Sequence, residues 1–367
     1  MSEYNWRRER EKFRPEITKG NNADTAENIQ VGMPEQRSSS AKIFCIIAGV
    51  VIIAVLAAAA IFIFKGDSSP FADVAEKYKT AVGLVTVTVE AKNGNKITAP
   101  VGTAWAFAGN RFATNGHVAN ALKTKMLNII NSTVSEMLMI EAEKAGYKSV
   151  DEFLKAQGNN AQNVIAAATK MVLAQIADVR ADIIINGSKK KSYSIAQVQV
   201  HKDYGVVGSK FNPDLAVLTI DGKHDNYFKL ADKSKLADLK SGMPIAFLGF
   251  PTERLLENNI HLDNPVASMQ CGTVVAVSDF DMKDAGVDGN FLLRHNLPAT
   301  GGASGSPIFN QDGEVVAALW GGNTIGQVSE NGQVVRAPSA VLINFGVRVD
   351  LLSGMNKAVP IKEILKF

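Results

Sequence analysis

The sequence predicts an all-β domain built from barrels, with one helical insertion and an N-terminal transmembrane helix. Three observations support this fold class. Short apolar runs separated by turn residues fill most of residues 70–352, residues 119–179 repeat apolar side chains at helical spacing, and residues 43–64 carry no charge. Many short strands with frequent turns are typical of barrels rather than of a parallel sheet.

The apolar segment 43–64 comes first along the chain and is bounded by Lys42 and Lys65. At 1.5 Å per residue it crosses a hydrocarbon layer about 30 Å thick. A cleaved signal peptide is the alternative, and Ala58–Ala60 offers a cleavage patch, but the apolar region of a signal peptide has only about 7–15 residues. We therefore expect a single-pass anchor, preceded by a disordered tail over residues 1–42 that mixes charges with Gly, Asn, Gln and Ser.

Segments of strand character follow from residue 82 onwards. They are rich in β-branched and aromatic side chains and are bounded by turn pairs such as Asn186-Gly187 and Asp312-Gly313. The expected strands cover residues 82–89, 97–107, 182–185, 193–200, 214–220, 243–249, 267–277, 291–294, 307–309, 315–320 and 341–347.

The block at residues 119–179 interrupts this strand pattern. Its first part repeats apolar residues at steps of three and four, which predicts a helix through Leu122, Met126, Ile129, Ile130, Val134, Met137 and Leu138. Ser149 and Glu152 have the spacing of a capping box, so a second helix is expected there, and a third over 164–176. We interpret the block as a helical insertion, which is either a structural decoration or a lid or docking surface.

The composition excludes several classes of function. The 367 residues are 46% hydrophobic and 20% charged with a net charge of +3, which is typical of a globular protein and gives no reason to expect a nucleic-acid partner. Cys45 and Cys271 lie on opposite sides of the expected membrane boundary, so no disulfide is predicted, and Cys271 is expected to be a buried small residue. The sequence has no cluster of Cys and His, so we expect neither a metal nor a cofactor.

A glycine-rich loop at residues 300–307 gives the strongest indication of function. Its sequence, TGGASGSP, surrounds Ser304 with glycines, which allow backbone N–H groups to converge at positive φ angles. Such a loop can direct the amides of Gly302 and Ser304 at an oxygen that becomes negative during acyl transfer. We therefore predict that Ser304 is a nucleophile and that these two amides form its oxyanion hole.

Two further residues complete the chemistry that a serine nucleophile needs. His117 follows the strand-like residues 112–116, and Asp214 begins the expected strand 214–220. The order His, Asp, Ser is that of double-barrel enzymes, whereas an α/β-hydrolase needs a histidine after the serine, and none follows Ser304. A subtilisin-like arrangement needs a helix after the nucleophile, where this sequence predicts strand, turn and strand. The predicted triad is His117, Asp214 and Ser304.

Taken together, these motifs resemble those of trypsin-fold serine proteases of the bacterial type, and are similar to both HtrA/Deg proteases and glutamyl endopeptidases. The segments that carry the resemblance are 102–105, 114–118, 214–218, 249–251, 301–307 and 319–322. The resemblance implies two perpendicular β-barrels with the triad in the cleft between them. It also implies a protease domain over residues 70–352, followed by a C-terminal extension over residues 353–367.

The function implied by the resemblance is that of a membrane-anchored serine endopeptidase that hydrolyses peptide bonds through an acyl-enzyme. Its substrate is expected to pair with the strand edge at Leu319, Trp320 and Gly321. Ala299 and Leu319 suggest small or aliphatic side chains at the cleaved position. Leu319 replaces the histidine with which glutamyl endopeptidases bind an acidic side chain, Ala303 replaces an asparagine or aspartate, and no PDZ domain is expected after the protease domain.

Protein or peptide substrates and the membrane are therefore the expected partners, and the formation of a homo-oligomer is left open. Lys and Arg flank residues 43–64 on both sides, so charge alone does not set the orientation. The resemblance implies a cytoplasmic N-terminus and an extracytoplasmic protease domain in a bacterial cell membrane. Two alternatives stay open: a catalytically silent pseudoprotease that binds peptides or scaffolds partners, and an esterase that uses the same triad.

Overall fold

The computed structural model describes residues 70–189, 191–251, 261–322, 324–328, 334–338 and 343–367. The chain divides into two units, residues 1–66 and 67–367, and all described residues belong to the second. The expected tail and the transmembrane helix at 43–64 lie outside the described residues, so both stay predictions. Within the described ranges, no helix combines the length and the apolar character that crossing a membrane requires.

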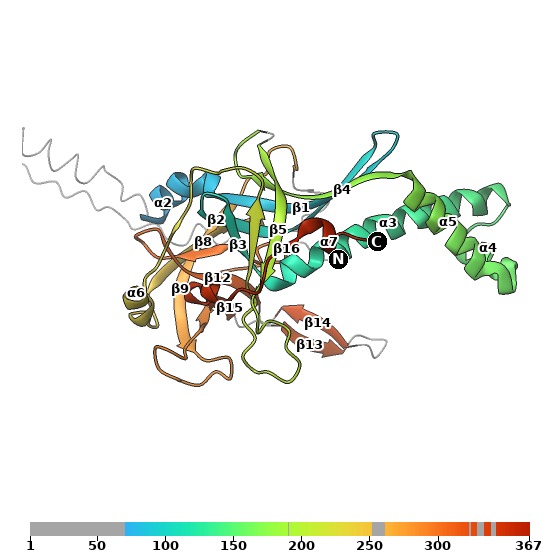
Figure 1. Ribbon diagram of the computed structural model, residues 1–367. Helices are drawn as coiled ribbons and strands as arrows, with labels where there is room; N and C mark the ends of the chain where they lie inside the picture. Colours follow the sequence, from blue (N-terminus) through green and yellow to red (C-terminus); the bar gives the residue numbers. More distant parts are fainter. Residues whose placement is uncertain (1–69, 190, 252–260, 323, 329–333, 339–342) are drawn as a thin grey trace, which may run out of the picture. The chain divides into compact units, whose positions relative to one another are not determined.

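The first barrel is closed by six antiparallel strands in the order β1–β2–β3–β6–β5–β4, with β4 pairing back onto β1 (Figure 1). These strands are β1 (Val82–Ala91), β2 (Lys96–Ala108), β3 (Arg111–Thr114), β4 (Ile176–Ile185), β5 (Ser192–Val200) and β6 (Ala216–Ile220). Strand β1 is buried on both faces: Val85 and Val87 point into this barrel, and Val82 and Leu84 pack in a second cluster that the two barrels share. This double burial explains why β1 is a continuous apolar run rather than an alternating one.

The second barrel repeats the closed six-stranded design in the order β8–β9–β10–β15–β12–β11, with β11 pairing back onto β8. Its strands are β8 (Pro244–Gly249), β9 (Ser268–Ser278), β10 (Leu292–His295), β11 (Pro307–Phe309), β12 (Glu314–Gly322) and β15 (Asn344–Arg348). The two barrels confirm the predicted double-barrel fold. Each expected strand has a counterpart in the structure, with ends that differ by a few residues.

An aromatic core holds the two barrels together. Phe228, which lies between them in the sequence, stacks on Tyr78 at 4.4 Å, meets Trp105 of the first barrel edge-on at 6.0 Å and packs on Phe309 of the second barrel at 5.7 Å between ring centroids. Tyr78 ends α2 (Pro70–Tyr78), a short helix that the sequence analysis did not predict. Because this core links both barrels, side chains from each can be held at fixed distances in one site.

The helical insertion consists of α3 (Gly116–Lys144), α4 (Val150–Gln157) and α5 (Ala161–Gln175). Leu122 and Met126 pack the first part of α3 into the core of the first barrel. Helices α4 and α5 lie against the part of α3 that is distant from the barrel (Figure 1). Ser149 caps α4, since the Glu152 N–H donates to Ser149 Oγ at 3.2 Å. The Glu152 carboxylate accepts from the Lys148 N–H at 3.1 Å, one residue before the bond that a capping box would make. The insertion is shifted from the expected 119–179: α3 begins at Gly116, and residues from Ile176 onwards already belong to β4.

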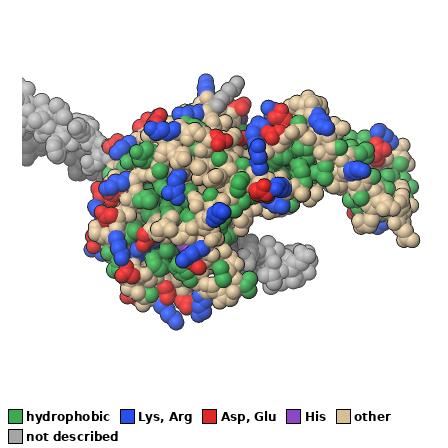
Figure 2. Space-filling view, viewed as in Figure 1, with side chains coloured by type: hydrophobic (Ala, Val, Ile, Leu, Met, Phe, Trp, Pro, Cys, Tyr) green, Lys and Arg blue, Asp and Glu red, His purple; other side chains and the backbone are tan. Residues whose placement is uncertain are grey.

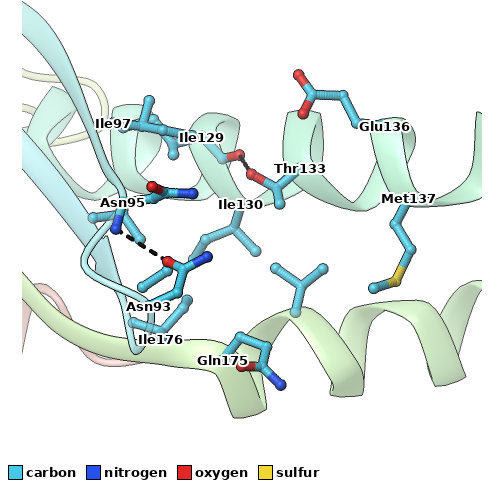
Figure 3. A pocket seen from close by; sticks show the side chains of 13 residues that line it. Asn93, Asn95, Ile97, Ile129, Ile130, Thr133, Glu136, Met137, Gln175 and Ile176 are labelled. Carbon is cyan, nitrogen blue, oxygen red and sulfur yellow. Dashed lines mark hydrogen bonds between the residues drawn. The ribbon is translucent and has the colours of Figure 1, made fainter. Parts of the chain in front are cut away.

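A pocket of about 310 Å³ lies where α3 and the end of α5 meet the turn between β1 and β2 (Figure 3). Its wall is mainly apolar, with side chains such as Ile97, Ile130 and Ile176, and Asn95 and Glu136 are among its polar lining residues. This hollow belongs to the insertion, and none of the predicted site residues lines it.

The C-terminal residues return from the second barrel to the first. After η3 (Val349–Gly354), strand β16 (Val359–Pro360) pairs with β5, and Ile361 and Leu365 at the short helix α7 (Ile361–Ile364) pack into the first core. Further elements outside the prediction are η1 (Lys79–Ala81), η2 (Gly158–Asn160), β7 (Lys229–Leu230), α6 (Lys233–Ala237) and the hairpin of β13 (Thr324–Val328) and β14 (Val334–Pro338).

Candidate active site

His117 lies in the first turn of α3, shortly after β3, which pairs with β2 and β6 in the first barrel. The expectation that His117 lies at a turn before the insertion is wrong. Asn115 has extended backbone, and the helix starts at Gly116, so His117 is part of the helix. Gly116 leaves room for a neighbouring ring, because a Cβ atom at this position would lie 2.6 Å from Tyr204 Cδ1. The helix start therefore fixes the backbone that carries the imidazole.

Asp214 holds His117 through both of its carboxylate oxygens. Oδ1 accepts from the His117 backbone N–H at 2.8 Å, and Oδ2 accepts from Nδ1 at 2.5 Å. Because a carboxylate can only accept, this contact places a proton on Nδ1 and leaves Nε2 to face other groups. Asp214 is 1% exposed, and its backbone carbonyl accepts from the side-chain amide (Nδ2) of Asn115 at 2.8 Å. The imidazole is thus fixed in both tautomer and orientation.

Tyr204 is a neighbour of this pair that the sequence analysis missed. Burial, reinforced by the nearby charge of Asp214, raises the pKa of its hydroxyl to about 12. The ring packs against the backbone of Gly116, immediately before His117. No local motif marks this contact, since Gly116 begins α3 while Tyr204 lies in the connection between β5 and β6.

Some backbone N–H groups of the glycine-rich loop are hydrogen-bonded within the protein, and others are not. Gly302 and Gly305 have φ angles of +87° and +86°, in the region that glycine tolerates best. The N–H groups of Ala303, Gly305 and Ser306 donate to the carbonyls of Thr300, Leu319 and Ala303 at 3.2, 2.8 and 3.0 Å. Within the described residues, the N–H groups of Gly302 and Ser304 make no hydrogen bond. These are the two amides that the sequence predicts as the oxyanion hole.

Ser304 reaches the neighbourhood of His117 through β2. The Ser304 carbonyl accepts from the Thr103 N–H at 3.0 Å. A Cβ atom on the adjacent Gly102 would lie 2.8 Å from the Val118 side chain and 3.3 Å from the Ser304 carbonyl oxygen, so Val118, the residue after the histidine, and the carbonyl of the serine both pack against Gly102. Among the residues described, no hydrogen bond joins His117 to the Ser304 hydroxyl. Such contacts often tighten only when substrate binds.

The second hydroxyl of the loop has a different environment. Ser306 is 0% exposed, and its hydroxyl donates to the Ala303 carbonyl at 2.6 Å. Ala303 is itself buried in the core of the second barrel. Ser304, in contrast, is half-buried. Of the two serines, Ser304 is therefore the one placed to meet a substrate.

Three of the four predicted substrate-binding residues lie on β12, where Leu319 and Trp320 pack in different apolar clusters. Leu319 is 1% exposed and packs in the same apolar cluster as Ala299, while Trp320 packs on Phe345 with ring centroids 6.0 Å apart. Strand β11 pairs with β12 only as far as Ala318, and the space beside Gly321 is open, with no atom within 4 Å of a Cβ position. On one edge, β12 pairs with β15 through Leu319, Gly321 and Gly322. The opposite edge has no strand partner beyond Ala318 among the described residues, so an extended peptide can pair there.

The described residues outside this site were compared with the ligand sets that metal ions need. Within the described ranges, no group of three or more His, Cys, Asp and Glu side chains is arranged to hold a metal ion. Cys271 is exposed, which corrects the expectation that it is buried, and partial burial raises the pKa of its thiol. On the face in Figure 2, Lys and Arg are interspersed with Asp and Glu, so that face has no large surface of one charge sign.

Comparisons with known proteins identify the family of this chain. The sequence profile of the trypsin-like peptidase domain family matches residues 102–317, more than half of the chain. Among solved structures, the HtrA-type protease AlgW with decapeptide is 12% identical, with a TM-score of 0.41 and coverage of 77% of this chain. The match spans 64% of the AlgW chain. Deg5 is 14% identical, with a TM-score of 0.40 and coverage of 78% of this chain and 92% of its own. The comparison with curated proteins returned no significant match.

Proposed function

This chain belongs to the trypsin-like peptidase domain family, and from that membership we propose that it is a serine endopeptidase acting through His117, Asp214 and Ser304. The observation that carries the proposal is the pairing of His117 with Asp214 through two hydrogen bonds, at 2.8 and 2.5 Å, although the residues are 97 positions apart. The nearby glycine-rich loop supplies a half-buried serine and two amides without acceptors among the described residues.

The proposed first step forms the acyl-enzyme. His117 Nε2 takes the proton of the Ser304 hydroxyl while Oγ bonds to the scissile carbonyl carbon. The carbon–nitrogen bond then breaks, and the imidazolium returns its proton to the leaving amine. Asp214 stays ionised and stabilises the imidazolium through Nδ1. Water repeats the sequence on the acyl-enzyme and releases the acid product.

The oxyanion of each tetrahedral intermediate would be stabilised by the amides of Gly302 and Ser304. Both amides belong to a loop in which the N–H groups of Ala303, Gly305 and Ser306 are already bonded, which favours a fixed orientation before substrate arrives. Pre-oriented donors of this kind cost no reorganisation during the reaction, and loss of one such donor typically lowers the rate about 10²–10³-fold.

The substrate we propose is an extended peptide that pairs with the free edge of β12 near Gly321. The apolar surroundings of Ala299 and Leu319 favour a small or aliphatic side chain at the cleaved position. Cleavage of a peptide library tests this specificity, and products ending mainly in acidic or basic residues would contradict it.

Membrane attachment belongs to the proposal as well and depends on sequence alone. The uncharged segment 43–64 would anchor the chain, with its N-terminus in the cytoplasm and the protease domain on the other side of the membrane. Digestion of terminal tags by an added protease, in intact cells and in cells whose membrane has been opened, tests this orientation. A protease domain digested only after the membrane is opened would contradict an exposed extracytoplasmic domain.

Activity of the full chain on unstructured peptides, compared with the Ser304→Ala variant, tests the proposed reaction. We expect turnover by the parent protein, none by Ser304→Ala, and normal turnover by the matched control Ser192→Ala, whose serine is exposed on β5. Peptide binding without turnover by the parent protein would favour the pseudoprotease. Hydrolysis of esters but not of peptides would favour the esterase.

A further inference from the structure

Thr103 connects the first barrel to the glycine-rich loop through a set of hydrogen bonds that none of the predicted roles uses. It is 0% exposed on β2. Its N–H donates to the Ser304 carbonyl at 3.0 Å, and its hydroxyl donates to the Gly302 carbonyl at 2.9 Å. The same hydroxyl accepts from the Phe250 N–H at 3.1 Å, at the end of β8 in the second barrel. One side chain therefore joins the two barrels and the loop.

These contacts fix the peptide groups on either side of the proposed nucleophile. The group between Gly302 and Ala303 is bonded at its carbonyl by the Thr103 hydroxyl and at its N–H by the Thr300 carbonyl. The group between Ser304 and Gly305 is bonded at its carbonyl by the Thr103 N–H and at its N–H by the Leu319 carbonyl.

The peptide group between these two carries the Ser304 N–H. Its carbonyl, that of Ala303, accepts from Ser306 through both N–H and hydroxyl. Since a peptide group is planar, bonding its carbonyl on one side directs the Ser304 N–H to the opposite side. Thr103 thus holds both neighbours of the group that supplies this amide.

We propose that Thr103 is a positioning residue, which holds the glycine-rich loop in the form that presents the amides of Gly302 and Ser304 to a developing oxyanion. This inference rests on the proposed function and names a determinant of its rate. The hydroxyl is the essential part, because it is both donor and acceptor. A valine of similar shape leaves the Gly302 carbonyl and the Phe250 N–H unpaired in a buried site, and the loop then has reason to move.

A substitution series on the full-length chain tests the role of the hydroxyl. Thr103→Val removes it, Thr103→Ser keeps it, and Thr103→Cys replaces it with a weaker hydrogen-bonding group. The matched control is Thr98→Val on the same strand, which removes a 2.9 Å hydroxyl contact with Thr88 on the neighbouring strand β1. Three kinds of measurement are made: the rate of Ser304 labelling by a fluorophosphonate, kcat and KM on peptides, and amide hydrogen exchange of the loop.

We expect Thr103→Val to lower kcat and the labelling rate about 10- to 100-fold, because a displacement of about 1 Å at a reacting group has effects of this order. KM should change less than about twofold, because the edge of β12 that binds substrate is untouched. Loop exchange should become faster in Thr103→Val. Thr103→Ser and Thr98→Val should keep parent-like rates and exchange.

A labelling rate of Thr103→Val equal to that of the parent, or a Thr103→Ser variant as slow as Thr103→Val, would overturn the proposal. If the valine variant does not fold, Thr103→Cys and Thr103→Ser decide: a slower cysteine variant supports the role of the hydroxyl, and equal rates overturn it. If the folded parent protein is not labelled at all, the proposed function has failed. Loop exchange then decides separately, since faster exchange in Thr103→Val or Thr103→Cys supports the positioning role and unchanged exchange overturns it.

Discussion

The buried histidine His295 should make the stability of this protein depend on pH in a predictable way. It lies at the end of β10, is 0% exposed, and neither of its ring nitrogens has a hydrogen-bond partner among the described residues. Burial lowers its pKa from 6.5 to about 4, and the nearby Phe345 backbone opposes only part of this shift. The folded protein therefore keeps His295 neutral over a range in which the unfolded chain protonates it.

The sign and size of the effect follow from these two pKa values. Between pH 6.5 and pH 4 the unfolded state binds the extra proton, so stability falls as the pH is lowered through this range. One pKa unit corresponds to about 1.4 kcal/mol, so the free energy of unfolding should drop by about 2 kcal/mol between pH 7.5 and pH 5 through His295 alone. Below about pH 3, where His295 is protonated in both states, this contribution should change no further.

Equilibrium urea unfolding at pH 7.5 and pH 5, for the parent protein and for His295→Phe, measures this contribution. The phenylalanine does not titrate, so the variant should lose about 2 kcal/mol less than the parent on acidification. Burial also lowers the pKa values of His201 and His224, but both act equally in the two proteins and cancel in the comparison. Equal losses in the two proteins would refute the reasoning, whatever the absolute stability of the variant.

Three further predictions test the site and its support. Asp214→Asn should lower kcat about 10⁴-fold near neutral pH in steady-state assays, because the tautomer and the imidazolium lose their carboxylate, while circular dichroism stays parent-like. Gly116→Ala should lower kcat about 10-fold, because the new Cβ atom forces the Tyr204 ring away. In a double-mutant cycle, adding Tyr204→Ala should restore part of the lost kcat, and additive effects of the two substitutions on kcat would contradict the contact. Leu122→Ala should cost about 2–5 kcal/mol in urea unfolding, since this side chain is fully buried where α3 meets the first barrel, and a loss below about 1 kcal/mol would place it outside the core.

Much of the fold could be predicted because the strand signals are local. Apolar runs of three to eleven residues, many of them bounded by turn residues, marked the strands of both barrels, and the sequence after Ser304 correctly indicated β11, a turn and β12. Strand ends were less certain because propensity changes gradually along the chain. Ile176 is an example, since its apolar neighbours suit the end of α5 as well as the beginning of β4.

The start of α3 shows where local reasoning was insufficient. Residues 112–116 have strand character, so the sequence suggested that His117 lies at a turn after a strand, with the insertion beginning after it. In the structure the helix begins at Gly116, and the Asp214 carboxylate accepts the His117 N–H, one of the amides that a helix leaves unpaired in its first turn. That acceptor comes from 97 residues further along the chain, so no pattern near His117 could reveal it.

The same limit applies to the supporting residues of the site. The chemical identities of His117, Asp214 and Ser304 could be proposed from short motifs, since each motif is contiguous. Thr103 was part of such a motif, but its bond to the Gly302 carbonyl joins residues 199 positions apart, and Tyr204 meets Gly116 through tertiary packing alone. Contacts of this kind are decided by how the two barrels and their loops come together, which sequence spacing does not specify.

Mapping the covalent adduct of a fluorophosphonate by peptide mass spectrometry tests the central claim most directly, namely that an imidazole of the first barrel activates a hydroxyl of the second. The parent protein should carry the label on Ser304 and not on Ser306, and His117→Ala should be labelled at least about 10²-fold more slowly. A label at another residue, or equal labelling of the folded parent protein and His117→Ala, would contradict the account.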